Sequence, residues 1–475
     1  MPRRTTHLLA DLLAGATVLL LFALNPVARQ AAPAPAAVPP QAMPIAAFSF
    51  GPYAALAMPQ ADPPDSPLLR VARRLHARLA RQNVTPPPLS ALVSALEEQR
   101  TLLHARTTVH LSPPDGGSAE TWEADLQRYP HWMQAVMTER DAHFLLNPAA
   151  ISRTLREENL PGTLPPVHVA LQEIVEDGDL LRARTEDVAK GGIVLDVPTA
   201  VVAVYDALLR GTEAITLPLH AVNGEVTNVT GTDLGALALL GTGRSDFAGS
   251  PVGRIRNIHK ALRTHVNNIL VPPGATFSFN DTLGGPVTLS RGWYESKVIF
   301  EGVNLRMAPG GGICQASTTV FRAMLHAGLQ EEERANHSIY VSYYEKHGVG
   351  IDATVFPGDQ DLTFVNDTGN YLLLQAYDEG TEAVVHIYGT PDGRSVALRG
   401  PYFASSDFSD YPAEIRPPRS NEIAWIQQRT FADGMTEERP IFSRYITGVP
   451  KVLAAKYNAL HASAAGTGST LISER

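Results

Sequence analysis

The sequence predicts an α+β protein, in which helices and antiparallel strands come from separate segments of the chain. Apolar residues recur at helical spacing in residues 68–81, short apolar and alternating runs typical of strands fill residues 339–388, and turn residues separate these segments. At 475 residues, with 44% hydrophobic and 18% charged side chains, the chain has the length for two or three domains and the composition of a globular protein.

The first 30 residues have the features of an export signal. Arg3 and Arg4 precede an apolar stretch at 12–24, which is short for a membrane-spanning helix and suits the core of a signal peptide. A cleaved signal peptide and an uncleaved membrane anchor fit residues 1–30 equally well, and a buried helix is the alternative. Residues 31–67 are rich in Ala and Pro and are expected to form a semi-rigid linker. We therefore expect an extracytoplasmic protein, either secreted or anchored to the cytoplasmic membrane.

Residues 68–230 are predicted to form a small α+β domain. Ser66-Pro67 is typical of a helix start, and the helix that follows has one apolar face and several arginines. Such a basic amphipathic helix either lies on anionic lipid or presents a solvated face. Further helices are expected after Asn147-Pro148 and at Pro198, and Asp177-Gly178 is expected to turn a hairpin.

Residues 240–390 are predicted to form a second α+β domain, with a cysteine-bearing helix against an antiparallel sheet. One helix is expected at 254–269, and a second begins at Cys314, runs to about residue 325 and stops at Gly328. The strand candidates are residues 339–344, 351–356, 362–365, 371–376 and 383–388. Residues 391–475 are expected to be a C-terminal extension with few strands and a disordered tail from residue 464.

Composition and motifs exclude several classes of function. A net charge of −9 argues against nucleic acid as a partner. Cys314, His337, His347 and Asp352 are of metal-ligand type, but they lack paired spacing such as HxxxH or CxxC, so we expect neither a metal nor a cofactor. The sequence also lacks a phosphate-binding glycine motif and the Gly-x-Ser-x-Gly motif of serine hydrolases.

The only cysteine, Cys314, follows three glycines at the expected start of a helix. The partial positive charge of a helix N-terminus favours the thiolate and lowers the pKa of the thiol. His337 and Asp352 follow in the order of a base and an orienting acid, so we expect the three to be catalytic residues. The alternatives are a buried apolar Cys314, a structural hydrogen bond from His337, and a turn capped by Asp352.

Four further residues are candidates for substrate binding. Gln315, Trp293 and Tyr294 could join the backbone N–H of Cys314 as donors to an oxyanion. Arg334 could bind a substrate carboxylate with two parallel hydrogen bonds, or alternatively form a salt bridge with a neighbouring glutamate.

These segments resemble the VanW family, bacterial cell-envelope proteins first noticed beside glycopeptide-resistance genes. The resemblance covers about residues 240–390. It rests on Arg254, Asn257 and Ile258, on Pro273-Gly274, and on residues 276–280, 310–315, 317–319, 337–338 and 352–355. It implies an exported envelope protein and, for residues 68–230, a peptidoglycan-binding-like module, with a spacer domain as the alternative. The order Cys314, His337, Asp352 also distantly resembles transglutaminase-like and papain-like cores.

Two functions fit these observations. The first is a thiol-dependent amide-bond hydrolase or transferase, acting on peptidoglycan. The second is a non-enzymatic envelope-binding or scaffold protein with a structural cysteine. A catalytic Cys314 needs a histidine beside it, whereas a structural one needs only burial. The sequence identifies neither the substrate nor the oligomeric state.

Overall fold

The computed structural model describes residues 66–300, 304–406, 408–446 and 453–457. The predicted signal or anchor, nearly all of the linker and the predicted disordered tail lie outside the described residues. The chain divides into two compact units, one of residues 1–164 with 193–221 and one of residues 165–192 with 222–475. No helix in the described ranges is both long and apolar enough to span a membrane.

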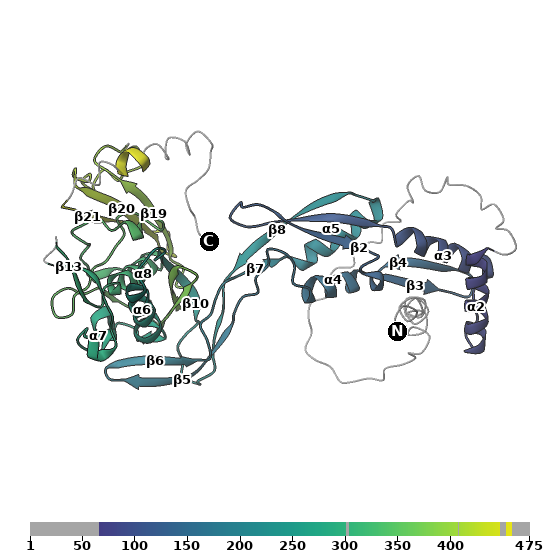
Figure 1. Ribbon diagram of the computed structural model, residues 1–475, viewed down its shortest axis with the longest axis horizontal. Coiled ribbons are helices and arrows are strands. Elements are labelled where there is room, and N and C mark those ends of the chain that lie inside the picture. The colour runs from purple at the N-terminus through teal and green to yellow at the C-terminus, as the bar shows by residue number, and fades with distance from the viewer. Residues whose placement is uncertain (1–65, 301–303, 407, 447–452, 458–475) are drawn as a thin grey trace, which may run out of the picture. The chain divides into compact units, whose positions relative to one another are not determined.

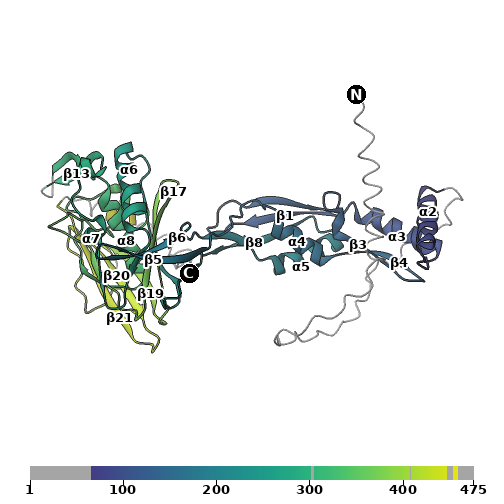
Figure 2. The same ribbon diagram turned by 90° about the horizontal axis from the view of Figure 1, so that it is seen from below.

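The first unit combines helices with a small sheet (Figures 1 and 2). Ser66 starts α2 as predicted, because its hydroxyl accepts a hydrogen bond from the backbone N–H of Leu69 at 3.1 Å. The helices are α2 (Pro67–Arg81), α3 (Leu89–Leu102), α4 (Pro148–Glu157) and α5 (Val197–Arg210). The sheet order is β2 (Glu120–Asp125), β1 (Arg106–Ser112), β8 (Ala214–Val222) and β7 (Gly192–Leu195).

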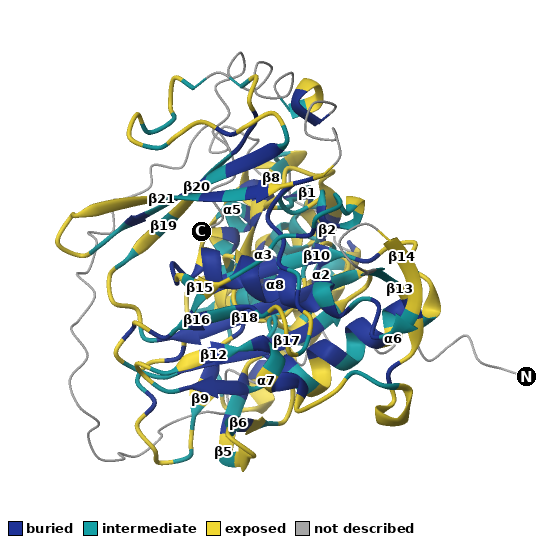
Figure 3. Cartoon of the chain, turned by 90° about the vertical axis from the view of Figure 1, so that its left-hand side faces the viewer, coloured by how far each residue is buried: buried dark blue, intermediate teal, exposed yellow. Residues whose placement is uncertain are grey.

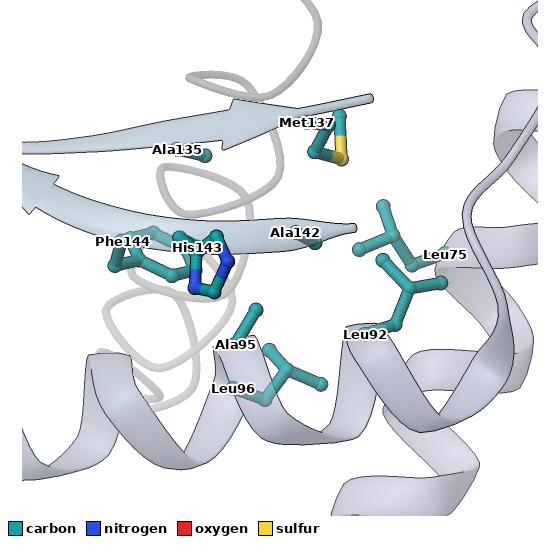
Figure 4. Close-up of a pocket in the computed structure, with 9 residues that line it drawn as sticks. All are labelled: Leu75, Leu92, Ala95, Leu96, Ala135, Met137, Ala142, His143 and Phe144. Atoms are coloured by element: carbon teal, nitrogen blue, oxygen red, sulfur yellow. The ribbon is translucent and has the colours of Figure 1, made fainter. Parts of the chain in front are cut away.

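A small apolar pocket of this unit lies between α2, α3 and the hairpin of β3 (Met133–Met137) and β4 (Ala142–Leu146) (Figure 4). Leu75, Leu92 and Met137 are among its lining residues. None of the residues predicted to be catalytic lines it.

The second unit is built on a seven-stranded sheet, antiparallel except where β5 pairs with β9. Its order is β10 (Ala238–Asp246), β18 (Glu382–Gly389), β17 (Leu372–Glu379), β11 (Ile269–Val271), β6 (Leu180–Thr185), β5 (Val169–Asp177) and β9 (Val226–Asn228). The predicted hairpin is present as β5 and β6, with its turn at Gly178 in the left-handed region. We predicted it within the domain of residues 68–230, but β6 pairs with β11 and so joins the sheet of the second unit.

The cysteine-bearing helix α8 (Ile313–His326) packs directly on β10 and β18, as predicted for a helix against an antiparallel sheet. Two glycines of β10 permit this close contact. A Cβ atom at Gly241 would lie 2.5 Å from the carbonyl oxygen of Ala323, and one at Gly243 would lie 2.0 Å from that of Thr319. The backbone of α8 therefore lies against the backbone of β10, with no space for side chains between them.

Gly328 ends α8 as the sequence predicts. It adopts a φ of 72°, and its N–H donates to the carbonyl of Leu325 while the N–H of Leu329 donates to that of Met324. These two hydrogen bonds form a Schellman motif, which satisfies the last carbonyls of the helix.

The C-terminal region is a correction to the sequence analysis, which expected few strands after residue 390. It contains a three-stranded antiparallel sheet of β19 (Ser395–Tyr402), β20 (Glu422–Thr430) and β21 (Thr436–Arg444). This sheet lies on the other side of α8 from β17 and β18 (Figure 3), and the side-chain amide of Gln427 donates to the carbonyl of Leu325 at 2.7 Å. The apolar run of residues 423–426 forms the middle strand, but the surrounding Pro-rich and charged residues obscured it in the sequence.

Two of the strands predicted within residues 240–390 are wrong. Residues 339–344 contain a 3-10 turn, η5 (Ser342–Tyr344), and residues 351–356 form only isolated bridges, from Thr354 to Ala335 and from Phe356 to Gln360. The other three candidates are strands β16 (Thr363–Val365), β17 and β18. The predicted helix at 254–269 is α6 (Val252–Lys260) continued by a π-helical turn, η3 (Ala261–Val266).

The remaining elements of the second unit are short and surround α8. They are β12 (Thr276–Ser278), α7 (Phe279–Leu283), η4 (Leu289–Arg291), β13 (Glu295–Phe300), β14 (Asn304–Pro309) and β15 (Glu331–Glu333). α8 contributes seven buried residues to the largest hydrophobic cluster, which also includes residues of β17 and β18.

Candidate active site

The glycine loop before Cys314 is fixed by a buried asparagine of α6. Gly312 has a φ of 115°, a conformation that residues with a side chain rarely adopt. The side-chain amide of Asn257 donates to the carbonyls of Gly311 at 3.0 Å and Tyr294 at 2.8 Å, and its oxygen accepts from the N–H of Tyr294 at 2.8 Å. Asn257 is fully buried, so these bonds hold the loop, and with it the start of α8, in one position.

Cys314 is the second residue of α8 and is partly exposed. Its sulfur donates to the carbonyl of Val355 at 3.5 Å and lies 3.6 Å from the hydroxyl oxygen of Thr354. Its backbone N–H forms no hydrogen bond within the described part of the chain. The first turn of α8 therefore places a thiol and a free backbone donor side by side.

The segment that carries Asp352 is bound to the face of α8 on which Cys314 lies. The hydroxyl of Ser317 donates to the carbonyl of Ala353 at 2.7 Å, and that of Thr318 both donates to this carbonyl and accepts from the N–H of Ala353. Positions three and four residues after Cys314 lie on one face of a helix with it. These bonds therefore hold the segment of Asp352 against the face of α8 that carries Cys314.

His337 and Asp352 form a buried pair. The Nδ1 atom of His337 lies 2.5 Å from Oδ2 of Asp352, and the backbone N–H of His337 donates to the same oxygen at 2.7 Å. The other carboxylate oxygen accepts from the hydroxyl of Tyr445 at 2.7 Å. The ring of His337 also acts on the thiol of Cys314, since each of the two groups shifts the pKa of the other. Because Asp352 occupies Nδ1, Nε2 is the nitrogen left for the thiol.

The electrostatics of the three residues are coupled. Burial raises the pKa of the Cys314 thiol, but the hydrogen bond and charge of His337 lower it more, to about 7. Burial lowers the pKa of His337, yet Tyr344, Asp352 and Cys314 together raise it well above its usual value. Burial raises the pKa of Asp352, and its bonds to His337 bring it down to about 2. The site therefore favours a thiolate beside an imidazolium.

The structure thus brings the three predicted catalytic residues together, although neither His337 nor Asp352 lies on a strand. His337 and Asp352 lie in extended segments outside any strand, joined through the bridge between Ala335 and Thr354. Their backbone groups are held by side chains instead of a continuous ladder of strand hydrogen bonds.

Arg334 is not available to a substrate, and it forms no salt bridge among the described residues. Its guanidinium donates to the carbonyl of Asp352 at 2.6 and 2.8 Å, to that of Phe442 at 3.0 Å and to the hydroxyl of Ser443 at 2.6 Å. It also lies over the ring of Phe321. Both interpretations of Arg334 from the sequence are therefore wrong, because β21 supplies acceptors that no local pattern predicts.

Gln315 points away from the thiol, and its proposed role at an oxyanion is wrong. The side chain is fully buried, and its amide donates to the hydroxyl of Ser245 on β10 at 3.2 Å. Residue 315 follows Cys314 by one position, which turns it to another face of the helix.

The aromatic candidates lie on the α6 side of the glycine loop. Trp293 is buried and stacks on His265 with ring centroids 5.3 Å apart, while Tyr294 lies under Arg256 and is bound to Asn257 through its backbone. Neither side chain hydrogen-bonds any of the three predicted catalytic residues. Their observed contacts are structural.

Sequence reasoning missed Tyr445 and Arg322. Tyr445 lies beyond β21, 93 residues from Asp352, and no spacing rule connects them. Arg322 is buried in α8 and donates to the carbonyls of Ile351, Tyr344 and Gly348, which fixes the loop between His337 and Asp352. A charged residue inside the apolar helix was the available signal for Arg322.

The described residues contain no group of three or more His, Cys, Asp and Glu side chains placed to hold a metal ion. His347, one of the residues of metal-ligand type, lies 2.8 Å from Glu382.

Comparison with known proteins finds one matching family model and two curated relatives. Residues 253–388 match the model described as VanW like protein. The chain is 35% identical over 144 residues to the uncharacterized protein YoaR of Bacillus subtilis (strain 168), and 31% identical over 126 residues to the vancomycin B-type resistance protein VanW of Enterococcus faecalis (strain ATCC 700802 / V583).

These two matches cover 30% and 24% of this chain, and 46% and 42% of the respective relatives. The chain therefore spans less than half the length of either relative. No solved structure matches it.

Proposed function

We propose that this chain, a VanW family protein by its residues 253–388, is a thiol-dependent acyltransferase or hydrolase that cleaves amide bonds. One observation carries the proposal: His337 is bound through Nδ1 to the Asp352 carboxylate, and its ring lowers the pKa of the Cys314 thiol. A nucleophile, a base and a group that orients the base are the minimum for this chemistry.

In the proposed reaction the sulfur of Cys314 attacks the carbonyl carbon of an amide. His337 holds the thiol proton and donates it to the leaving amine as the C–N bond breaks and a thioester forms. Water or an acceptor amine then attacks the thioester, His337 takes a proton from it, and the thiol is released. Asp352 stays ionised throughout and holds His337 by Nδ1.

The charge that develops on the carbonyl oxygen needs a donor. The backbone N–H of Cys314 is suited to this, because it has no partner in the described part of the chain and lies in the first turn of a helix. A donor fixed in this way loses little entropy when the transition state forms.

Peptidoglycan outside the cytoplasm is the proposed setting. Arg3 and Arg4 before the apolar residues 12–24 support export, and the Ala/Pro-rich segment that follows supports a spacer between an anchor and the folded units. Peptidoglycan peptides offer amide bonds accessible to an exported enzyme.

Trapping of the thioester tests the proposal. The full chain would be incubated with peptidoglycan fragments, quenched in acid and analysed by intact-protein mass spectrometry. We expect a covalent adduct on the native protein and none on Cys314→Ala, with His337→Ala greatly slowing its formation. If no adduct and no cleaved product form, and Cys314 titrates like an ordinary thiol, the scaffold function with a structural cysteine replaces this proposal.

A further inference from the structure

Arg254 is a buried cation without an anionic partner. It lies on α6, is 9% exposed, and forms no salt bridge or hydrogen bond through its side chain within the described residues. Its Nη1 atom is enclosed and has no acceptor. Its Nε and Nη2 atoms are not fully enclosed. A buried guanidinium left in this state costs free energy unless an anion from outside the chain completes it.

The side chain of Arg254 lies between two parts of the site. At its base, its Cγ and carbonyl oxygen would be 3.1 and 3.0 Å from a Cβ at Gly312, the residue that caps α8. At its tip, the guanidinium carbon is 4.6 Å from the ring centroid of Tyr343.

The tyrosine next along the chain connects this guanidinium to the catalytic histidine. The rings of Tyr344 and His337 have centroids 5.5 Å apart. Burial raises the pKa of Tyr344, and the charges of His337 and Arg254 act against that rise. Arg254 is therefore close enough to act on the residues that face the thiol.

We infer that Arg254 binds a carboxylate of the acyl substrate while Cys314 attacks the neighbouring amide. The planar guanidinium matches the two oxygens of a carboxylate, and such charge-assisted hydrogen bonds are strong where water is excluded. The substrate class is then a peptide with a free carboxylate close to the amide that is cleaved. This inference rests on the proposed function, because it assumes that Cys314 is the nucleophile.

Two small alkylating reagents test the inference without a known substrate. Iodoacetate carries a carboxylate beside its reactive carbon, whereas iodoacetamide is neutral and almost the same size. The rates of Cys314 alkylation by both would be measured well above the thiol pKa, where the thiolate is fully formed in every variant. The ratio of the iodoacetate rate to the iodoacetamide rate then reports on anion binding alone.

We expect Arg254→Gln to lower this ratio by about tenfold, as the loss of one charge-assisted hydrogen bond predicts. Arg254→Lys keeps the charge without the planar fork and should give an intermediate ratio. Arg256→Gln is the matched control, because it removes a positive charge from the exposed face of the same helix and should leave the ratio nearly unchanged.

Equal ratios for the native protein and Arg254→Gln would overturn the inference, as would an equal fall in Arg256→Gln. Thermal unfolding checks that each variant is folded. If Arg254→Gln does not fold, the ratio measured for Arg254→Lys tests the inference in its place. A failure of the proposed function would be recognised differently. The pH dependence of alkylation by iodoacetamide would then give an ordinary thiol pKa for Cys314, and His337→Ala would not change that pKa.

Discussion

His337 donates to a single oxygen of Asp352 twice, from Nδ1 at 2.5 Å and from its own backbone N–H at 2.7 Å. The second bond fixes the main chain of the histidine as well as its ring. The imidazole therefore cannot turn away from Asp352 unless the backbone of residue 337 moves too. This double contact fixes which ring nitrogen remains for Cys314.

The first prediction concerns the titration of the thiol. Because the pKa of Cys314 is about 7, alkylation by iodoacetamide should be half-maximal near pH 7 and fall at lower pH as the thiolate is protonated. In His337→Ala the main effects that lower this pKa are lost while burial still raises it, so the midpoint should move to higher pH. Stopped alkylation reactions followed by mass spectrometry give both curves. Coincident curves would show that His337 does not act on the thiol.

The second prediction concerns Asp352. Asp352→Asn replaces an acceptor of three hydrogen bonds and leaves His337 without its anion, so we expect a loss of about 3 kcal/mol in the free energy of unfolding. The alkylation midpoint should also rise, since the imidazolium is no longer stabilised. Tyr445→Phe is the matched control, because it removes one of the three bonds and should cost about 1 kcal/mol. Denaturant titration measures both, and equal losses would contradict the assignment.

The third prediction concerns how the contribution of Asp352 to the free energy of unfolding changes at acid pH. The pKa of Asp352 is about 2 in the folded protein, below the ordinary value of 3.8. Its contribution is therefore fully present above about pH 4 and is lost as the pH falls towards 2. The difference in unfolding free energy between the native protein and Asp352→Asn should shrink over this window. A constant difference would mean that Asp352 is not ionised in the folded state.

The fourth prediction concerns Asn257. Asn257→Ala removes three hydrogen bonds and leaves the carbonyl of Gly311 without its buried donor, so we expect a loss of about 2 kcal/mol or more. The loop would then move, and alkylation of Cys314 at neutral pH should slow even where the protein stays folded. Asn228→Ala, on the short strand β9, provides an asparagine control outside the site, and its alkylation rate should equal that of the native protein.

The fifth prediction tests the contact between α8 and β10. Gly243→Ala would place a methyl group 2.0 Å from the carbonyl oxygen of Thr319, so the helix must shift and we expect a loss of about 3 kcal/mol. Ala238→Gly at the exposed start of the same strand should cost less than about 1 kcal/mol. Thermal unfolding compares the two variants, and similar melting temperatures would contradict this packing.

Local signals predicted the parts of the site that are built locally. The glycines before Cys314 and Gly328 after the apolar run define α8 almost to the residue, because backbone conformations with positive φ leave a direct mark on sequence. The order Cys314, His337, Asp352 also identified three residues that the structure brings together.

The errors involve contacts between distant segments. Arg334 was predicted to face a substrate, yet its partners include residues 108 and 109 positions away on β21. Residues 339–344 have the apolar pattern of a strand. The buried guanidinium of Arg322, and not a neighbouring strand, donates hydrogen bonds to carbonyls of this loop. An arginine that satisfies backbone carbonyls has no signature in periodicity.

The hydroxyl of Tyr445 reaches Asp352 from outside the segment that matches the family model, which stops at residue 388. A gene fragment trimmed to residues 253–388 would therefore encode Cys314, His337 and Asp352 but omit the hydroxyl that binds the second oxygen of Asp352. It would also leave one side of α8 uncovered, since β19 to β21 would be missing. Expression of that fragment alone should give an aggregating protein, so a negative assay of the fragment would not test the activity proposed for the full chain.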